Sequence, residues 1–412
     1  MNRRILFALI VTASLLTSAA SVTTRTRSQM QAIKPAVAAP VTIPFELVTR
    51  HIVLKVSVNN SRPLSFVLDT GDKYAVIDLD RARELGLNLQ GEVRVGGAGA
   101  ETRSGAFVRD ATFSLPGLTG FSQPVTLALP IGRMAPKFGH DFDGIIGEDF
   151  IKQFVVEIDY PAGVIKLHDK SKFKYSGSGE SVPLKLNSAG HPIIEAELTT
   201  MSGESIKGNF VVDIGSGAAL SLYSPFVSQR KLLDSNLKTI KSIGAGGAGG
   251  QIQGQLGRVS ELKIGKFKIS QPITLFSQDK AGAFASAELL GNIGAQIMSK
   301  FRIFLDYENE RMMLEPGSGL AEPFDRAFSG FSLQAEGKEY RTFRILEVLE
   351  NSPASEAGLQ RNDIIARIDG KLASELTLTQ LNEILERAKS YTLTVQRGEQ
   401  TLQIKFTPRK LI

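Results

Sequence analysis

The sequence carries the same set of landmarks twice, in the same order, and this duplication restricts the fold more than any other feature. In each copy an apolar run ends in an aspartate that is followed two residues later by a glycine: Asp69 and Gly71, then Asp213 and Gly215. Each copy continues with a Gly-Gly-Ala-Gly segment, then a glycine-bounded apolar element, then an apolar run ending in Asp-Tyr: 96–99, 144–147 and 154–160, then 246–249, 291–294 and 301–307. The nearly constant offset predicts two related lobes.

Two glycine–serine segments, 176–179 and 316–319, divide the remaining sequence. Short apolar runs separated by glycine, asparagine and proline, with 23 phenylalanines against 7 tyrosines, predict a mainly β protein. We therefore expect lobe 1 at residues 43–174, lobe 2 at residues 180–315 and a C-terminal domain at residues 325–412.

The N-terminus has the pattern of a secretory signal peptide. Basic residues follow the initiator methionine, residues 5–16 are apolar, and small residues occupy positions 18–20. The apolar run is short for a bilayer-spanning helix, which needs about 20 residues. We predict a signal peptide at 1–20, a flexible spacer at 21–42, no stable membrane insertion after cleavage, and export to the periplasm or the medium.

Composition excludes several classes of function. The chain has no cysteine, and its four histidines are widely separated in sequence, so we expect no disulfide, zinc or thiol chemistry and no metal. The net charge of +6 comes mostly from residues 1–45, which contain five basic residues and no acidic one. The rest of the chain is nearly neutral, and we expect no nucleic-acid partner.

The chemistry of the repeat lies in its two Asp-x-Gly turns. A carboxylate at the end of an apolar strand is costly unless it has partners or a role. Two such turns that meet at a pseudo-twofold axis would place Asp69 and Asp213 side by side. Because two adjacent carboxylates cannot both ionise cheaply, they would share one proton, and one group could act as base while the other acts as acid.

The segment from Phe66 to Gly71 resembles the active-site turn of aspartic proteases of the retropepsin and pepsin type, and 144–147 and 291–294 resemble the glycine element that packs behind it. The likeness covers roughly residues 43–315 and is greatest to bacterial exported proteins with two retropepsin-like lobes and a PDZ module. It implies an aspartic endopeptidase, with no cofactor, that hydrolyses peptides or proteins. Its implied residues are the catalytic pair Asp69 and Asp213, the turn residues Thr70, Gly71, Ile214, Gly215 and Ser216, and the flap glycines Gly96, Gly97, Gly99, Gly246, Gly247 and Gly249.

Two positions depart from that family. Ile214 stands where the family has a hydroxyl that braces the two lobes, and Asp72 stands where a small residue is usual. One alternative is therefore a catalytically inactive pseudo-protease that only binds peptides. A second is an active dimer formed through lobe 1 of two chains; the complete second lobe argues against it, and we expect a monomer.

The C-terminal domain resembles the PDZ domains attached to exported bacterial proteases, through the segments 351–359, 362–365 and 368–370. The resemblance implies that residues Gly330, Phe331, Ser332 and Leu333 form the loop that binds a peptide carboxylate. Thr377 and Gln380 predict a capping box for a helix whose apolar face holds Leu381, Ile384, Leu385 and Ala388. An alternative is that this domain only packs on the lobes.

Two weaker motifs point elsewhere. Residues 244–249 match the GxGxxG pattern of dinucleotide-binding proteins, but the alternating sequence that follows predicts a hairpin instead of the required helix, so we expect a flexible flap. His51 lies in a strand pattern and is predicted to be a surface or packing residue, not a ligand.

Overall fold

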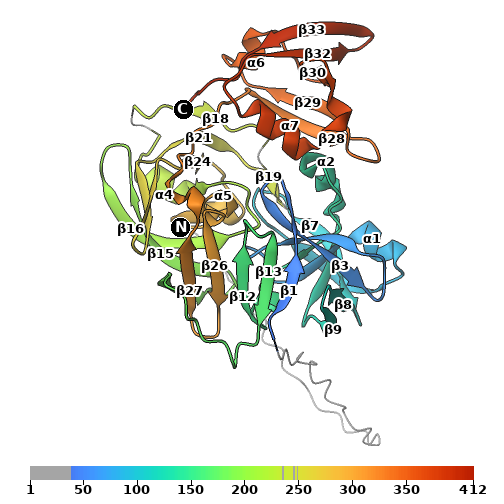
Figure 1. Cartoon of the computed structure of the whole chain (residues 1–412), viewed down its shortest axis with the longest axis vertical. Helices are drawn as coiled ribbons and strands as arrows, with labels where there is room; N and C mark the ends of the chain where they lie inside the picture. The colour runs from blue at the N-terminus through green and yellow to red at the C-terminus, as the bar shows by residue number, and fades with distance from the viewer. Residues whose placement is uncertain (1–38, 234–235, 245, 248) are drawn as a thin grey trace, which may run out of the picture. The chain divides into compact units, whose positions relative to one another are not determined.

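The computed structural model describes residues 39–233, 236–244, 246–247 and 249–412, and within these ranges the chain is mainly β (Figure 1). The predicted signal peptide and most of the predicted spacer lie outside the described residues. The first strand, β1 (Val41–Pro44), pairs with residues 164–167, so residues 41 and 42, which the prediction placed in the spacer, belong to a strand.

Lobe 1 is built on a ten-stranded sheet of order β6-β7-β10-β5-β11-β4-β3-β8-β9, with β2 beside β3. Its strands are β2 (Glu46–Val48), β3 (His51–Val58), β4 (Leu64–Leu68), β5 (Ala75–Asp78), β6 (Asn88–Val95), β7 (Arg103–Arg109), β8 (Thr112–Leu115), β9 (Leu118–Ser122), β10 (Thr126–Leu129) and β11 (Gly144–Ile146). Its short helices are α1 (Leu79–Glu84), η1 (Gly132–Met134), α2 (Ala135–Phe138) and α3 (Glu148–Ile151). All five residues of β4 are buried, including Ser65, which explains why apolar residues lie on both faces of that strand.

Lobe 2 belongs to a fifteen-stranded sheet that also takes in three strands from the lobe 1 side. Those three are β1, β12 (Val155–Asp159) and β13 (Val164–His168). The others are β14 (Glu180–Leu186), β15 (Pro192–Thr199), β16 (Ser205–Asp213), β17 (Leu220–Leu222), β18 (Ile240–Lys241), β21 (Gly254–Arg258), β22 (Glu261–Ile264), β23 (Phe267–Ser270), β24 (Ile273–Ser277), β25 (Gly291–Gly294), β26 (Phe301–Asp306) and β27 (Arg311–Pro316). A separate hairpin pairs β19 (Gly246–Gly247) with β20 (Gly250–Gln251), and the helices are α4 (Ser224–Gln229), η2 (Ala283–Ala285), α5 (Ala295–Met298) and η3 (Ser318–Ala321).

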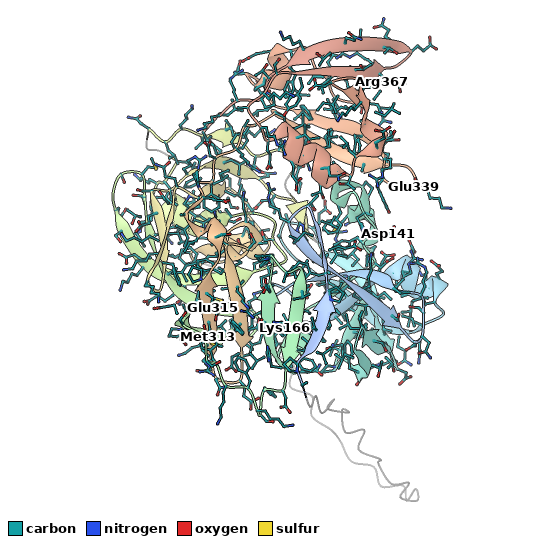
Figure 2. All side chains as sticks on the ribbon, viewed as in Figure 1. Asp141, Lys166, Met313, Glu315, Glu339 and Arg367 are labelled. Atoms are coloured by element: carbon teal, nitrogen blue, oxygen red, sulfur yellow. The ribbon has the colours of Figure 1, made fainter. Side chains whose placement is uncertain are left out.

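The two lobes are joined through the antiparallel pairing of β12 with β26, in which Val156 lies opposite Leu305. Figure 2 marks Lys166 on β13 and Glu315 on β27, on the two sides of this junction. Residues of both lobes pack into one hydrophobic core, with Phe66 from lobe 1 and Phe210 from lobe 2 both fully buried. The lobes therefore share a sheet and a core.

The predicted duplication is visible in the strand pairing. In lobe 1, β11 runs parallel to β4 and antiparallel to β5, with Ile146 opposite Leu68. In lobe 2, β25 runs parallel to β16 and antiparallel to β17, with Gly294 opposite Asp213. Each aspartate thus leaves its strand beside the end of the corresponding glycine element.

The C-terminal domain has a sheet of order β28-β29-β30-β32-β33, with β31 beside β30, and a hydrophobic core of its own. Its elements are β28 (Phe331–Glu336), β29 (Thr342–Val348), α6 (Pro353–Glu356), β30 (Ile364–Ile368), β31 (Lys371–Leu372), η4 (Ala373–Glu375), α7 (Leu378–Leu385), β32 (Tyr391–Arg397) and β33 (Gln400–Phe406).

Helix α7 begins at the capping box predicted from the sequence. The Thr377 side chain accepts a hydrogen bond from the backbone N–H of Gln380, and the Gln380 side chain accepts one from Thr377 N–H. Leu381 and Leu385 are buried and Ile384 packs against the same core. The placement of Ala388 on this face was wrong: the helix ends at Leu385 and Ala388 is exposed.

Candidate active site

The aspartates of the two repeats meet between the lobes. Asp69 follows β4 directly, and Asp213 is the last residue of β16. A Cβ placed on Gly71 would lie 2.9 Å from Asp213 Oδ1, and one placed on Gly215 would lie 2.0 Å from Asp69 Cγ. Each turn therefore needs glycine because the carboxyl group of the other lobe occupies the space of a side chain.

Both turns are closed by similar hydrogen bonds. Asp69 O accepts from Asp72 N–H at 3.4 Å, and Asp213 O accepts from Ser216 N–H at 3.2 Å. In lobe 1, Gly71 N–H also donates to Asp69 Oδ1 at 2.7 Å, which orients that carboxyl group. The sequence-predicted turn residues are thus brought together around two half-buried carboxyl groups.

A hydroxyl brace between the lobes is present on one side. Thr70 is fully buried; its Oγ1 donates to Val212 O at 2.6 Å and accepts from Ile214 N–H at 2.9 Å. Ile214, the equivalent residue of lobe 2, is also fully buried but has no hydroxyl with which to return these bonds. The lobes are held by half of the brace, together with the apolar packing of the isoleucine.

Burial and mutual repulsion raise the pKa values of the carboxyl groups in this site. Burial is the main cause that raises the pKa of Asp69 above its ordinary value. Burial, and then the charge of Asp69, raise the pKa of Asp213 to about 8. Burial and the charge of Asp69 likewise raise the pKa of Asp72 to about 7. At neutral pH Asp213 is therefore able to hold a proton beside Asp69.

Asn292 is a member of this site that the sequence analysis did not assign. Its Nδ2 donates to Asp213 Oδ2 at 2.5 Å, and the residue is 2% exposed. The bond favours the ionised form of Asp213 and so opposes the rise in its pKa. The available signal was the asymmetry of the glycine elements: lobe 2 has an amide where lobe 1 has the apolar Ile145.

The two glycine-rich segments contact each other. Gly249 O accepts a hydrogen bond from Glu101 N–H at 2.8 Å, and a Cβ on Gly99 would lie 2.3 Å from the same oxygen. Gly97 O accepts from Ala283 N–H at 3.2 Å, while a Cβ on Gly247 would lie 3.0 Å from Ala98 Cβ. A Cβ on Gly96 would meet open space, and Gly246 pairs with Gln251 across the β19–β20 hairpin.

His51 packs between the lobes, in agreement with the packing role predicted for it. Its ring lies 5.1 Å from that of Phe138, and a Cβ on Gly217 would lie 3.1 Å from its Cε1. Burial lowers the pKa of His51, so the ring is neutral at neutral pH. It accordingly supplies no charge next to the Asp213 turn.

The predicted carboxylate loop begins at Gly330, whose φ of +83° is one that glycine adopts readily. Phe331 is buried in the core of the C-terminal domain and Leu333 packs against that core. Ser332 Oγ is buried and has no hydrogen-bond partner within the described parts of the chain.

Residues 54–150 match the family model described as aspartyl protease, and residues 344–397 match that of the PDZ domain. The chain carries an aspartyl protease-like domain and a PDZ domain. The aspartyl protease match contains Asp69 and ends before Asp213, so the assignment of the second aspartate depends on the repeat and on the geometry. The mainly β fold, the resemblance to aspartic proteases and the resemblance to PDZ domains are therefore confirmed.

Individual relatives match over limited lengths. A stretch of 67 residues is 33% identical to the serine protease HTRA1 of Xenopus laevis, and it spans 16% of this chain and 14% of that protein. The crystal structure of an aspartic proteinase from Irpex lacteus aligns with a TM-score of 0.44 and 17% identity, over 69% of this chain and 99% of that one.

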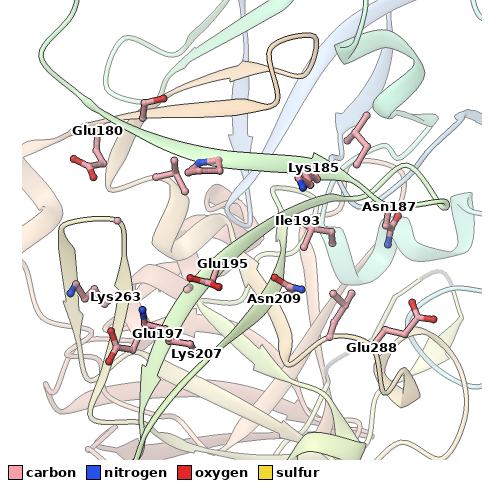
Figure 3. Close-up of a pocket in the computed structure, with 17 residues that line it drawn as sticks. Glu180, Lys185, Asn187, Ile193, Glu195, Glu197, Lys207, Asn209, Lys263 and Glu288 are labelled. Carbon is pink, nitrogen blue, oxygen red and sulfur yellow. The ribbon is translucent and has the colours of Figure 1, made fainter.

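Other features of the described residues lie apart from the dyad. They contain no group of three or more side chains placed to hold a metal ion, and none of their helices has the length and apolarity needed to cross a bilayer. A groove of about 690 Å³ lies on lobe 2 along β14, β15 and β16 (Figure 3). It is lined by charges of both signs, including Lys207, Glu195 and Lys263, and includes neither aspartate.

Proposed function

We propose that this protein is an aspartic endopeptidase in which Asp69 and Asp213 activate a water molecule, and that its PDZ domain binds peptides or protein C-termini. The observation that carries the proposal is the meeting of two carboxyl groups from duplicated lobes, each packed over the glycine of the other turn. The raised pKa of Asp213, about 8, supports a shared proton at neutral pH.

In the proposed reaction the ionised carboxylate accepts a proton from water as the water oxygen attacks the peptide carbonyl carbon. The protonated carboxyl group donates its proton to the carbonyl oxygen, which gives a neutral tetrahedral diol. The carbon–nitrogen bond then breaks, one aspartate delivers a proton to the leaving amine, and the other recovers a proton from the diol. The products are a carboxylic acid and an amine, and the dyad again holds one proton.

The first prediction is that Asp69→Asn and Asp213→Asn each abolish hydrolysis. Each substitution removes a group that both accepts and donates the shared proton, and general acid–base catalysis contributes about 10²- to 10⁴-fold. Because the two groups act as a unit, the double variant should be no worse than either single one. The measurement is cleavage of a diverse peptide mixture from acidic to neutral pH. Retention of most activity by Asp213→Asn would contradict the two-lobe dyad.

A second candidate function is that of a pseudo-protease that binds peptides without cleaving them. The specific observation in its favour is Ile214, which is fully buried and leaves the brace between the lobes half made. Against it, Thr70 alone makes two short hydrogen bonds across the interface, and Asn292 holds Asp213 from the other side. We therefore favour the active enzyme.

We also propose that the protein is exported and acts as a monomer. The basic residues, apolar run and small residues at positions 2–20 support removal of a signal peptide near Ala20. The second lobe supplies the partner that a single-lobed enzyme would need from another chain. N-terminal sequencing of the mature protein and size-exclusion chromatography test these two points.

A further inference from the structure

β28 is one of the two edge strands of the PDZ sheet, and it directly follows the predicted carboxylate-loop residue Gly330. An extended peptide would add beside this strand, with its carboxylate at the loop that begins at Gly330. Leu378 opens α7, the helix that packs on the same core, and Ser332 follows the first residue of β28. The expected peptide groove lies between β28 and α7, with Ser332 at the carboxylate end and Leu378 at the opposite end. The contacts of these two residues therefore show what lies against each end of the groove.

Lobe 1 covers one end. Helix α2 packs against β28, and Figure 1 shows it beside β28 and α7. A Cβ added at Gly139, the residue that ends α2, would lie 2.5 Å from Leu378 Cβ. Tyr340 of the PDZ domain donates a hydrogen bond from its hydroxyl to Asp141 Oδ1 at 3.2 Å. The segment after α2 thus lies where a bound peptide would leave the groove.

Lobe 2 covers the other end. A Cβ added at Gly244 would lie 2.7 Å from Ser332 Cβ, and Lys241 Nζ lies 3.2 Å from Glu347 Oε1. Gly244 stands shortly before the β19–β20 hairpin, whose glycines contact the glycine segment of lobe 1. Ser332 is therefore in contact with the segment that leads into the β19–β20 hairpin, whose glycines belong to the flap expected from the sequence.

A third contact joins the PDZ domain to the hairpin turn of β2 and β3. Arg50 donates two hydrogen bonds to Glu386 at 2.7 and 2.8 Å, and Thr49 N–H donates to Thr379 Oγ1 at 3.0 Å. Thr49 and Arg50 both have positive φ, 45° and 73°, which is unfavourable for these residue types. The next residue, His51, packs against the Asp213 turn at Gly217.

We propose that this closed arrangement is a resting state in which the two lobes cap both ends of the PDZ groove, and that a peptide with a free C-terminus activates the peptidase by displacing them. Such a peptide must move Gly139 and Gly244 away from the domain. Moving Gly244 frees the base of the β19–β20 hairpin, so that the glycine segments part and substrate reaches the dyad. The activation rests on the proposed function; the capping of the groove does not.

The test uses asparagine substitutions at Gly139 and Gly244 in the full chain. Both glycines have left-handed φ, +67° and +72°, which asparagine tolerates better than most residues. The three nearest atoms to a Cβ at Gly139 belong to Leu378, and the neighbours of one at Gly244 belong to Ser332, so each substitution should push away the PDZ domain alone. Gly86→Asn and Gly203→Asn are matched controls, with φ of +64° and +89° and nothing within 4 Å of the added Cβ.

Binding is measured first, in the Asp69→Asn background so that the probe is not cleaved. The probe is a random peptide library with free C-termini, compared with the same library amidated at the C-terminus. Gly139→Asn and Gly244→Asn should bind the free-carboxylate library about fivefold more tightly or better than the control variants, and the amides of β28 should exchange faster in the unbound protein. Equal binding and equal exchange in variants and controls would overturn the capping.

Hydrolysis of a fluorogenic peptide is measured second, with Asp69 intact. The two interface variants should be faster than wild type by about fivefold or more, and added library should accelerate wild type but not the variants. Tighter library binding without faster hydrolysis would overturn the activation. If no form hydrolyses any peptide, the proposed enzyme fails, and the binding and exchange results still decide whether the lobes cap the groove.

Discussion

At the scale of single residues, the dyad is held differently on its two sides. In lobe 1 the turn is fixed by Thr70, which bonds to the backbone of the other lobe, and by the Gly71 N–H on Asp69. In lobe 2 the side chain that restrains Asp213 is Asn292. Because backbone N–H and amide groups stabilise a carboxylate, these contacts decide how the shared proton is distributed.

Ile214→Thr tests whether lobe 2 has been repacked around an apolar residue. By the pseudo-twofold relation, a hydroxyl at position 214 would approach the backbone carbonyl of Leu68. If the carbonyl accepts, the net gain is about 1 kcal/mol, and the melting temperature and peptidase rate should hold or rise. A variant destabilised by about 1 kcal/mol and no more active would show that isoleucine packing has replaced the brace. An inactive wild type together with that result would favour the pseudo-protease.

Asn292→Leu should move the pH dependence of hydrolysis. The enzyme needs one proton on the pair, so activity falls as the pH rises through the upper pKa, about 8 for Asp213. Loss of the Nδ2 donor destabilises the ionised form and raises this pKa, so the alkaline limb should move up by about one pH unit. The rate at the optimum should also fall, because Asp213 loses its restraint.

The control for that change is Asn209→Leu on β16, whose side chain lines the groove on lobe 2 and lies outside the site. It should leave the pH profile unchanged. An Asn292→Leu enzyme with the wild-type alkaline limb would show that the amide only fills space beneath Asp213.

At the scale of elements, the sequence predicts those parts whose signal is local. The buried strand before each aspartate, the repeated glycine element and the Thr377 capping box were all readable, because burial on both faces and helix capping leave direct marks on composition. The pairing of β12 with β26 could not be predicted from the sequence, because strands that are distant in the sequence show no local pattern that identifies their partner. The contacts of Gly139 and Gly244 with the PDZ domain were hidden for the same reason: glycine reads as a turn whether or not another domain fills the space beside it.

The junction strands also contain a buried carboxylate whose charge is fully paired. Glu157 of β12 is 3% exposed and accepts hydrogen bonds from Lys166, His168 and, across the lobes, Arg302. Burial opposes its ionisation, but these bonds prevail and lower its pKa to about 2. A carboxylate whose pKa is lowered in the folded state stabilises the fold at pH values above its pKa in the unfolded chain, about 4.3. This contribution is lost as the pH falls towards 2.

Glu157→Gln should therefore lower the free energy of unfolding by about 2 kcal/mol at neutral pH, because three cationic or donor groups lose their acceptor charge. The difference from wild type should shrink between about pH 4 and pH 2, where the wild-type carboxylate becomes protonated. Urea denaturation at several pH values measures both effects. Glu308→Gln, which removes an exposed partner of Lys170, is the control and should change stability by no more than about 0.5 kcal/mol. A difference that persists undiminished at pH 2 would contradict the electrostatic account.

At the scale of the whole molecule, the described chain has two kinds of core. Lobes 1 and 2 contribute to one hydrophobic core and to one sheet through β12 and β26, whereas the PDZ domain has a separate core around Leu381 and Leu393. A shared core makes elements unfold together, while a domain with its own core can unfold independently, even though polar contacts, two close glycine approaches and the packing of Tyr340 on the lobe 1 cluster around Phe138 join it to the lobes.

This arrangement predicts two cooperative units, one formed by the two lobes together and one formed by the PDZ domain. In native-state hydrogen exchange under increasing urea, amides of β4 and β16 should converge on one opening free energy, because neither lobe can lose β12 or β26 without exposing the core of the other. Amides of β30 and β32 should converge on a second, lower value. Gly139→Asn should lower the second value towards that of an undocked PDZ domain and leave the first unchanged, whereas Gly86→Asn should alter neither by more than about 0.5 kcal/mol. Separate values for β4 and β16 would show that the sheet shared by the lobes does not couple their folding.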